Sequence, residues 1–121
     1  DLPLSQWRLR DHANIIYTFF PTTQLLVQQD HIVWIKSRPV SATETELRLV
    51  TLAPISLLED DEYWEKNHRI TSNTLNEDFV IGESIQASLV TGANEQMTFG
   101  RFEGALPEFN RVVKRYTSAQ V

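Results

Sequence analysis

The sequence predicts an α+β fold, in which an antiparallel sheet from the first half packs against helices from the second half. Three observations predict it. Residues before Pro54 form β-branched and aromatic runs. Short links join these runs, which favours an antiparallel meander. Residues after Leu57 repeat apolar side chains at helical spacing. Strands followed by helices are typical of a layered α+β domain.

The strands are predicted from local composition. The four predicted strand segments are Ala13–Phe20, Gln24–Gln29, His31–Pro39 and Thr43–Ala53. The first stops at Pro21, and the second and third flank a polar turn at Gln29 and Asp30, which predicts a hairpin. The fourth alternates charged with apolar residues, which is typical of a half-buried strand with one wet face.

The helices are predicted from periodicity and end signals. One helix is expected over Leu57–Thr71, which is acidic near its start and basic near its end. A second is expected over Thr74–Val90, because Thr74 and Glu77 form a capping-box pattern and Gly92 fits a C-cap. The remaining segments are an extended stretch, Met97–Phe102, and a last helix, Pro107–Thr117.

Composition bounds the class of protein. The 121 residues suffice for one domain, with 41% hydrophobic and 22% charged residues. A net charge of −5 argues against nucleic-acid and anionic-membrane partners. The chain has no cysteine, which excludes disulfides and thiolate metal sites and fits a cytoplasmic location. It has no long apolar run and no leader, and its start at Asp1 without Met predicts a domain cut from a longer polypeptide.

Asp78 is the candidate metal ligand, because it is expected on the apolar face of the second predicted helix. At about 100° per residue, the residues within a quarter turn of it are Thr74, Leu75, Ile81, Gly82, Ile85 and Leu89. A carboxylate on a buried face needs a partner. Periodicity leaves two roles of Asp78 open. In one, Asp78 pairs with an arginine or with backbone donors near the helix start. In the other, it acts as a metal ligand or a catalytic acid.

The histidines give no complete site. Glu65 and His68 form Glu-x-x-His, half of a di-iron pattern, but one copy beside a sheet predicts a solvated charged face instead. His12 and His31 lie near predicted strand starts. The sequence has no H-E-x-x-H, no P-loop and no G-x-G-x-x-G. The residues by themselves therefore identify no catalytic or cofactor-binding residue, and one candidate metal ligand.

Several segments, taken in order, resemble one family pattern. They are Tyr17–Leu25, His31–Trp34, Arg38–Val40, Asn76–Phe79, Glu83–Leu89, Phe99–Glu103 and Phe109. Together they resemble the C-terminal end of the catalytic domain in α subunits of Rieske-type non-haem iron ring-hydroxylating oxygenases. The resemblance covers most of the chain. It departs from the family at Thr22, where many members have Asn, and in lacking the Rieske ligands and the pair of iron-binding histidines.

The resemblance implies a partial helix-grip domain of the START/Bet v1-like kind, with residues 1–121 forming the C-terminal part of an oxygenase catalytic domain. It implies that Asp78 is the carboxylate of a 2-His-1-carboxylate iron site. Candidate lining residues of the substrate pocket share its face: Thr74, Leu75, Ile81, Gly82 and Ile85. The implied reaction is O₂- and NAD(P)H-dependent hydroxylation of an aromatic or small organic substrate, as in aromatic compound catabolism.

The resemblance also implies cofactors and partners for the parent protein. The parent would hold mononuclear Fe(II) and a [2Fe–2S] Rieske cluster, receive electrons through a reductase or ferredoxin, and form a homo-oligomer. The fragment is expected to hold none of these cofactors and to be inactive alone. Two other readings stay open: a non-catalytic helix-grip module that binds a small molecule, and a structural interaction domain.

Overall fold

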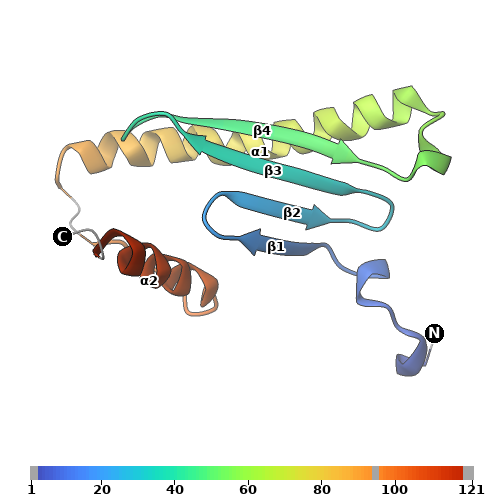
Figure 1. The fold of residues 1–121 in the computed structure, drawn as a ribbon, viewed down its shortest axis with the longest axis horizontal. Coiled ribbons are helices and arrows are strands. Elements are labelled where there is room, and N and C mark those ends of the chain that lie inside the picture. Colours follow the sequence, from blue (N-terminus) through green and yellow to red (C-terminus); the bar gives the residue numbers. More distant parts are fainter. Residues whose placement is uncertain (1–2, 94–95, 119–121) are drawn as a thin grey trace. The chain divides into compact units, whose positions relative to one another are not determined.

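The computed structural model describes residues 3–93 and 96–118. In chain order the elements are the 3-10 turns Leu4–Gln6 and Leu9–Asp11, strands β1 (Ile15–Phe19), β2 (Thr23–Val27), β3 (Ile32–Pro39) and β4 (Thr45–Leu52), the 3-10 turn Ile55–Leu57, and helices α1 (Asp61–Val90) and α2 (Ala105–Ser118) (Figure 1). They fall into two compact units, Asp1–Val80 and Ile81–Val121, with the division inside α1. The α+β class is confirmed.

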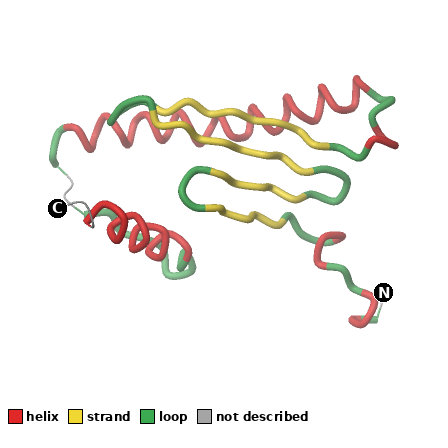
Figure 2. Tube along the Cα trace, viewed as in Figure 1, coloured by secondary structure: helices red, strands yellow, loops and turns green. Residues whose placement is uncertain are grey.

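The sheet is the predicted antiparallel meander, in the order β1-β2-β3-β4 (Figure 2). β1, β3 and β4 lie within their predicted segments, whereas β2 begins one residue earlier than predicted and ends two residues earlier. The register fixes which side chains share a face, because alternate residues of a strand point to opposite faces. One cross-strand row on one face is Ile16, Leu26, Val33 and Thr51. A row on the other face is Tyr17, Leu25, Trp34 and Val50.

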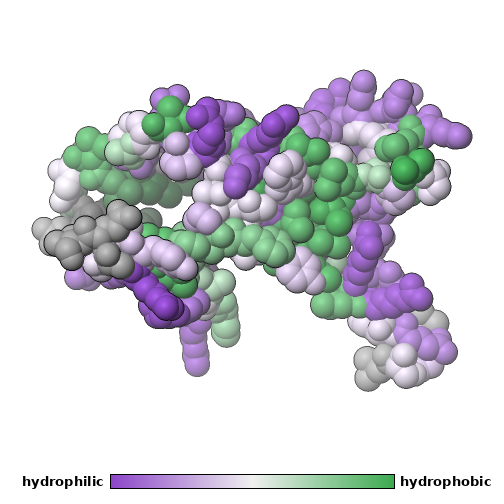
Figure 3. All heavy atoms as spheres, viewed as in Figure 1, coloured by the Kyte–Doolittle hydropathy of each residue, from purple (hydrophilic) through white to green (hydrophobic). Residues whose placement is uncertain are grey.

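Both faces of the sheet carry apolar side chains. The face with Val33 meets the first part of α1, where Thr51 Oγ1 lies 2.8 Å from His68 Nδ1 and Val33 is fully buried. The opposite face shows hydrophobic patches over the strands (Figure 3), and Tyr17 on this face is half exposed. Antiparallel sheets of soluble proteins commonly pair one apolar face with one solvated face. Apolar side chains on both faces are therefore the pattern expected of strands that are covered on both sides.

Helix α1 is one continuous helix. The prediction of two separate helices, over Leu57–Thr71 and Thr74–Val90, is therefore wrong. Helix α1 begins after Asp60, whose Oδ1 accepts the Tyr63 backbone N–H at 2.9 Å as an N-cap. The predicted capping box lies in the helix interior, where Thr74 Oγ1 donates to the Ile70 carbonyl at 3.1 Å. The predicted C-cap is confirmed, because Gly92 has a φ of 70° and its N–H bonds the Leu89 carbonyl.

The second unit contains the remainder of α1 and the helix α2. α2 begins two residues before the predicted start at Pro107, which occupies its first turn. Arg111 pairs with Glu108 one turn earlier along its surface. The stretch Met97–Phe102, expected to be extended, is irregular and ends in a turn, and it is not assigned as a strand.

Candidate functional site

Asp78 lies on α1 near the end of the first unit, and its side chain is exposed. Its carboxylate makes no hydrogen bond or ion pair with any described residue. The prediction that Asp78 lies on a buried face is therefore wrong for this chain. The pairing with an arginine, which periodicity left open, is also not formed among residues 3–93 and 96–118.

The exposure of Asp78 depends on its place along α1. The half-buried positions of α1 in the first unit are Trp64, Asn67, His68, Thr71, Ser72, Leu75 and Phe79. At 100° per residue they span about 140° around the helix, and Asp78 points between Asn67 and Thr71. The side of α1 that carries Asp78 is therefore half-buried at residues 67 and 71, whereas Thr74 and Asp78 on it are exposed.

The predicted pocket-lining residues divide between the two units. Thr74 and Leu75 belong to the first unit, where Thr74 is exposed and Leu75 is half-buried. Ile81, Gly82 and Ile85 belong to the second unit and are exposed. A Cβ placed on Gly82 would meet no atom within 4 Å.

The histidines are used structurally, each in a different way. His68 is half-buried and bonds Thr51 of β4, so the predicted solvated face at Glu65 and His68 is wrong for His68. His12 stacks on Trp7 with ring centroids 4.1 Å apart. Within the part of the chain that the structure describes, no three His, Cys, Asp or Glu side chains form a group able to hold a metal ion.

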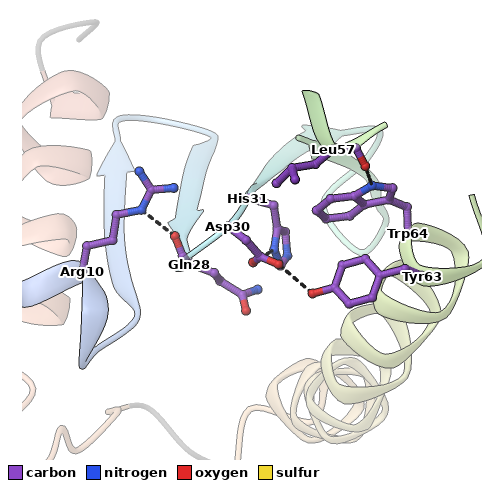
Figure 4. Close-up of polar contacts among 7 residues, drawn as sticks. All are labelled: Arg10, Gln28, Asp30, His31, Leu57, Tyr63 and Trp64. Atoms are coloured by element: carbon purple, nitrogen blue, oxygen red, sulfur yellow. Dashed lines mark hydrogen bonds and ion pairs between the residues drawn. The ribbon is translucent and has the colours of Figure 1, made fainter. Parts of the chain in front are cut away.

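A second polar site, which the sequence did not predict, forms where the β2–β3 turn meets the first turn of α1 (Figure 4). His31 Nδ1 lies 2.7 Å from Asp30 Oδ1, and the Tyr63 hydroxyl donates to Asp30 Oδ2 at 2.6 Å. His31 is 2% exposed and meets the Trp64 ring edge-on at a centroid distance of 5.6 Å. We call Asp30, His31 and Tyr63 the turn triad.

Electrostatics within the turn triad favours an ionised Asp30. The hydrogen bond from Tyr63 and then that from His31 hold the pKa of the Asp30 carboxyl below its ordinary value. The same carboxylate raises the pKa of Tyr63, because it accepts a hydrogen bond from the phenolic hydroxyl. His31 Nε2 is buried without a hydrogen-bond partner among the described residues. Buried polar atoms are nearly always partnered, so this nitrogen marks the site as unusual.

A cavity of about 410 Å³ adjoins the turn triad. The residues that line it are His12, Ala13, Asn14, Gln28, Gln29, Asp30, His31, Tyr63 and Asn67. Two contacts hold the N-terminal segment at this place: Arg10 Nε donates to the Gln28 carbonyl, and the Gln29 side chain donates to the Asp11 carbonyl, both at 2.7 Å. The cavity is therefore built from three segments of the first unit.

The opposite end of the strands carries a second cavity, of about 450 Å³, with a different charge. Its lining residues are Thr22, Lys36, Ser37, Arg38, Pro39, Glu46 and Arg48. Lys36 Nζ donates to Thr22 Oγ1 at 2.7 Å, and Arg38 pairs with Glu46. Three cations and one carboxylate make this cavity basic. Asp78 lines neither cavity.

The four-stranded antiparallel sheet and the long helix define an α+β domain. The chain matches the family model of the ring hydroxylating alpha subunit (catalytic domain) over residues 2–119. The chain belongs to this family, which confirms the resemblance drawn from segments such as Asn76–Phe79 and Phe99–Glu103.

Two further findings complete the comparison. Searches of curated proteins and of solved structures return no match. No helix in residues 3–93 or 96–118 has both the length and the apolar composition needed to cross a bilayer.

Proposed function

We propose that this chain supplies the carboxylate iron ligand, Asp78, to a Rieske-type non-haem iron oxygenase. The parent reaction is O₂- and NAD(P)H-dependent hydroxylation of an aromatic or small organic substrate. The observation that carries the proposal is the family match, which spans residues 2–119 and includes the helix with Asp78. An exposed carboxylate with no partner among the described residues is available to bind a cation.

The donor chemistry of Asp78 fits one position of the iron site. Carboxylate oxygen and imidazole nitrogen are the ligands of the 2-His-1-carboxylate site, which leaves open positions on the iron for O₂ chemistry. His68 lies ten residues from Asp78 on α1, about 15 Å along the axis, so the two cannot share an ion. No group of three or more His, Cys, Asp or Glu side chains among the described residues could hold a metal ion, so the two imidazoles are proposed to come from polypeptide outside these 121 residues. The chain alone is expected to be inactive.

The remaining parts of the proposal rest on the family match and on composition. A Rieske cluster needs two cysteines and two histidines, and this chain has no cysteine. The cluster is thus proposed to be held by the rest of the α subunit and reduced by a reductase or ferredoxin. The parent is proposed to be a cytoplasmic homo-oligomer, with a substrate pocket lined partly by Thr74, Leu75, Ile81, Gly82 and Ile85.

The decisive experiment substitutes Asp78→Ala in the parent α subunit. Loss of one of three iron ligands should remove the mononuclear iron and abolish turnover, while the absorbance of the Rieske cluster stays unchanged. Glu83→Ala is the matched control, because it removes an exposed carboxylate of the same helix about 140° away from Asp78. Iron content, turnover and absorbance are measured together. Normal iron and near-normal turnover in Asp78→Ala would overturn the assignment.

A companion experiment uses the 121-residue chain. One carboxylate without two imidazoles gives little affinity for Fe(II), so equilibrium dialysis should find weak iron binding or none. Stoichiometric, tight iron that survives in Asp78→Ala would show that other residues of the chain bind it.

A further inference from the structure

We call the cavity of about 450 Å³ at the far end of the strands the basic cavity. It lies wholly in the first unit, and its lining comes from the β1–β2 turn, β3 and β4. Its volume is in the range of small-molecule pockets. It shares no lining residue with the cavity beside the turn triad, and Asp78 does not line it. The basic cavity is therefore separate from the proposed iron ligand.

The sheet register places two cations side by side on the wall of the basic cavity. Lys36 of β3 is the direct partner of Arg48 of β4, so the two side chains share one face, with Cβ atoms about 5 Å apart. Like charges directly opposite each other destabilise a sheet. The neighbouring pair on this face, Arg38 and Glu46, has opposite charges and forms an ion pair. The cavity wall therefore contains one matched pair and one pair of like charges.

No described carboxylate neutralises the pair of like charges. Glu46 is the only acidic residue of the lining, and its Oε2 already accepts hydrogen bonds from Nε and Nη2 of Arg38. Neither Lys36 nor Arg48 forms an ion pair with any described residue. With three cations against one carboxylate, the lining carries an excess of two positive charges.

The ammonium group of Lys36 is held in place by hydroxyl groups. Its Nζ donates to Thr22 Oγ1 at 2.7 Å and to Thr23 Oγ1 at 3.3 Å. The Thr22 carbonyl in turn accepts hydrogen bonds from the Ser37 backbone N–H at 2.9 Å and from the Ser37 hydroxyl at 3.2 Å, which fixes the β1–β2 turn to β3. An ammonium has three N–H donors, so one donor of Lys36 stays available.

The guanidinium of Arg48 has more donors to offer. Arg48 is exposed, and its side chain makes no hydrogen bond with any described residue. A guanidinium has five N–H donors in a planar fork, which matches two oxygens of a carboxylate or a phosphate. A ligand that complements the basic cavity must therefore bring negative charge and several acceptor oxygens.

We propose that the basic cavity binds the phosphoryl group of a small phosphate monoester between Lys36 and Arg48. Such a group carries a charge of about −1.5 to −2 at pH 7 and has three acceptor oxygens, which matches the excess charge of the lining. Arg48 donates two parallel N–H bonds to it, and Lys36 acts as a point charge. A dicarboxylate fits less well, because it divides its charge between two groups, whereas the two opposed cations converge on one.

The test titrates the chain, labelled uniformly with ¹⁵N, at neutral pH and constant ionic strength. Methyl phosphate presents one phosphoryl group, succinate has two separate carboxylates, acetate has one, and glycerol is neutral. Methyl phosphate should give saturable shifts of the backbone amide resonances of Lys36, Ser37 and Arg48. Succinate and acetate should bind at least about tenfold more weakly, and glycerol should give no shift. No saturable shift with methyl phosphate, or equally tight binding of succinate or acetate, would overturn the proposal.

Two variants with opposite expected effects assign the binding to the basic cavity. Arg48→Gln should weaken methyl phosphate binding about tenfold or more, as expected for loss of a charged hydrogen-bond partner. Glu46→Gln removes the only carboxylate of the lining and releases Arg38, so it should tighten binding about threefold or more. Arg69→Gln is the matched control, because it removes an exposed cation of α1 outside the lining and should leave binding unchanged.

Glu46→Gln keeps the test decisive if Arg48→Gln disturbs the sheet, because loss of structure cannot tighten binding. Equal weakening in Arg48→Gln and Arg69→Gln would show a general charge effect. Weaker binding in Glu46→Gln would contradict the excess of positive charge as the cause of binding. Either result would overturn the proposal.

Discussion

The two halves of α1 differ in what their side chains contact. In residues 61–75 the side chains of Trp64 and His68 reach Leu57 and Thr51, and Tyr63 reaches the turn that precedes β3. In residues 76–90 the large aliphatic side chains are exposed, with Ile81 at 60% and Val90 at 70%, and Phe79 is half-buried. The hydrogen bonds that join α1 to the sheet, to the β2–β3 turn and to Leu57 are therefore all made by residues of its first half.

This difference separates the part of α1 that is fixed to the sheet from the part that carries the proposed ligand. The first half is fixed by directional contacts, which set the rotation of the helix about its axis. Asp78 follows directly after this fixed half, and its carboxylate has no partner among the described residues. The proposed function therefore requires that residues outside this chain hold the Asp78 carboxylate in place, because the carboxylate ligands of metals are themselves hydrogen-bonded.

The largest expected effect comes from removing the Trp64 side chain, which helps to fix the first half of α1. Trp64→Ala should lower the free energy of unfolding by about 3 kcal/mol, because the indole donates to the Leu57 carbonyl at 2.7 Å and packs against His31 and Tyr63. Ile81→Ala in the second half should change it by less than about 0.5 kcal/mol. Urea unfolding of both variants makes the comparison. Equal losses would remove the distinction between the halves.

A smaller effect is expected from the contact between His68 and Thr51. A double-mutant cycle of His68→Ala and Thr51→Val should give a coupling of about 1 kcal/mol, typical of one hydrogen bond. Glu65→Ala, paired with Thr51→Val, is the control and should be additive, since Glu65 is exposed on the same half of the helix. Additivity in the His68 cycle would mean that this contact does not hold α1 on the sheet.

Thr74 marks the transition between the halves, and its substitution distinguishes one helix from two. If α1 is continuous, Thr74→Ala should raise the stability by about 0.5 kcal/mol, because alanine is the better interior helix residue. If a helix began there, loss of the cap would instead cost about 1 kcal/mol. The sign of the change in unfolding free energy, measured against Asn73→Ala as a neighbouring exposed control, decides between them.

The smallest effect is the contribution of Asp30 to the pH dependence of stability. Its folded-state pKa is lowered below 3.8, chiefly by the Tyr63 hydrogen bond, so the stabilisation is present above that value and is lost as the pH falls through the folded pKa. Solvent around this partly exposed carboxylate reduces the size of the effect. Asp30→Asn should therefore flatten the stability curve below about pH 4. An unchanged slope between wild type and variant would contradict the assignment.

Much of the fold was predictable because strand and helix periods are local. β1, β3 and β4 lie within their predicted segments, since alternation and Pro21 mark them directly. The break predicted near Thr74 was wrong. The capping pattern of Thr74 and Glu77 favours a helix start there, but contacts of α1 that the sequence does not show favour a continuous helix. Among these are the contacts of His68 with the sheet.

The site was predictable only in part. The role of Asp78 as an iron ligand was predicted through resemblance to a family. The match confirms that the chain belongs to this family, whereas the role of Asp78 stays a prediction. The expected burial of Asp78 was wrong, because periodicity does not show how far along a helix its apolar side is covered. The turn triad escaped prediction because Tyr63 is 33 residues from Asp30, although the adjacent pair Asp30 and His31 was visible in the turn.

Because α1 is continuous, it fixes both the distance and the rotation between Tyr63 and Asp78. Between Tyr63 and Asp78 no loop can absorb a change in length, so one inserted residue would turn Asp78 by about 100° and advance it by about 1.5 Å relative to Tyr63. Seven inserted residues would nearly restore its direction while displacing it by about 10 Å. Lengths in this interval are therefore expected to be inherited unchanged, or altered by whole pairs of turns.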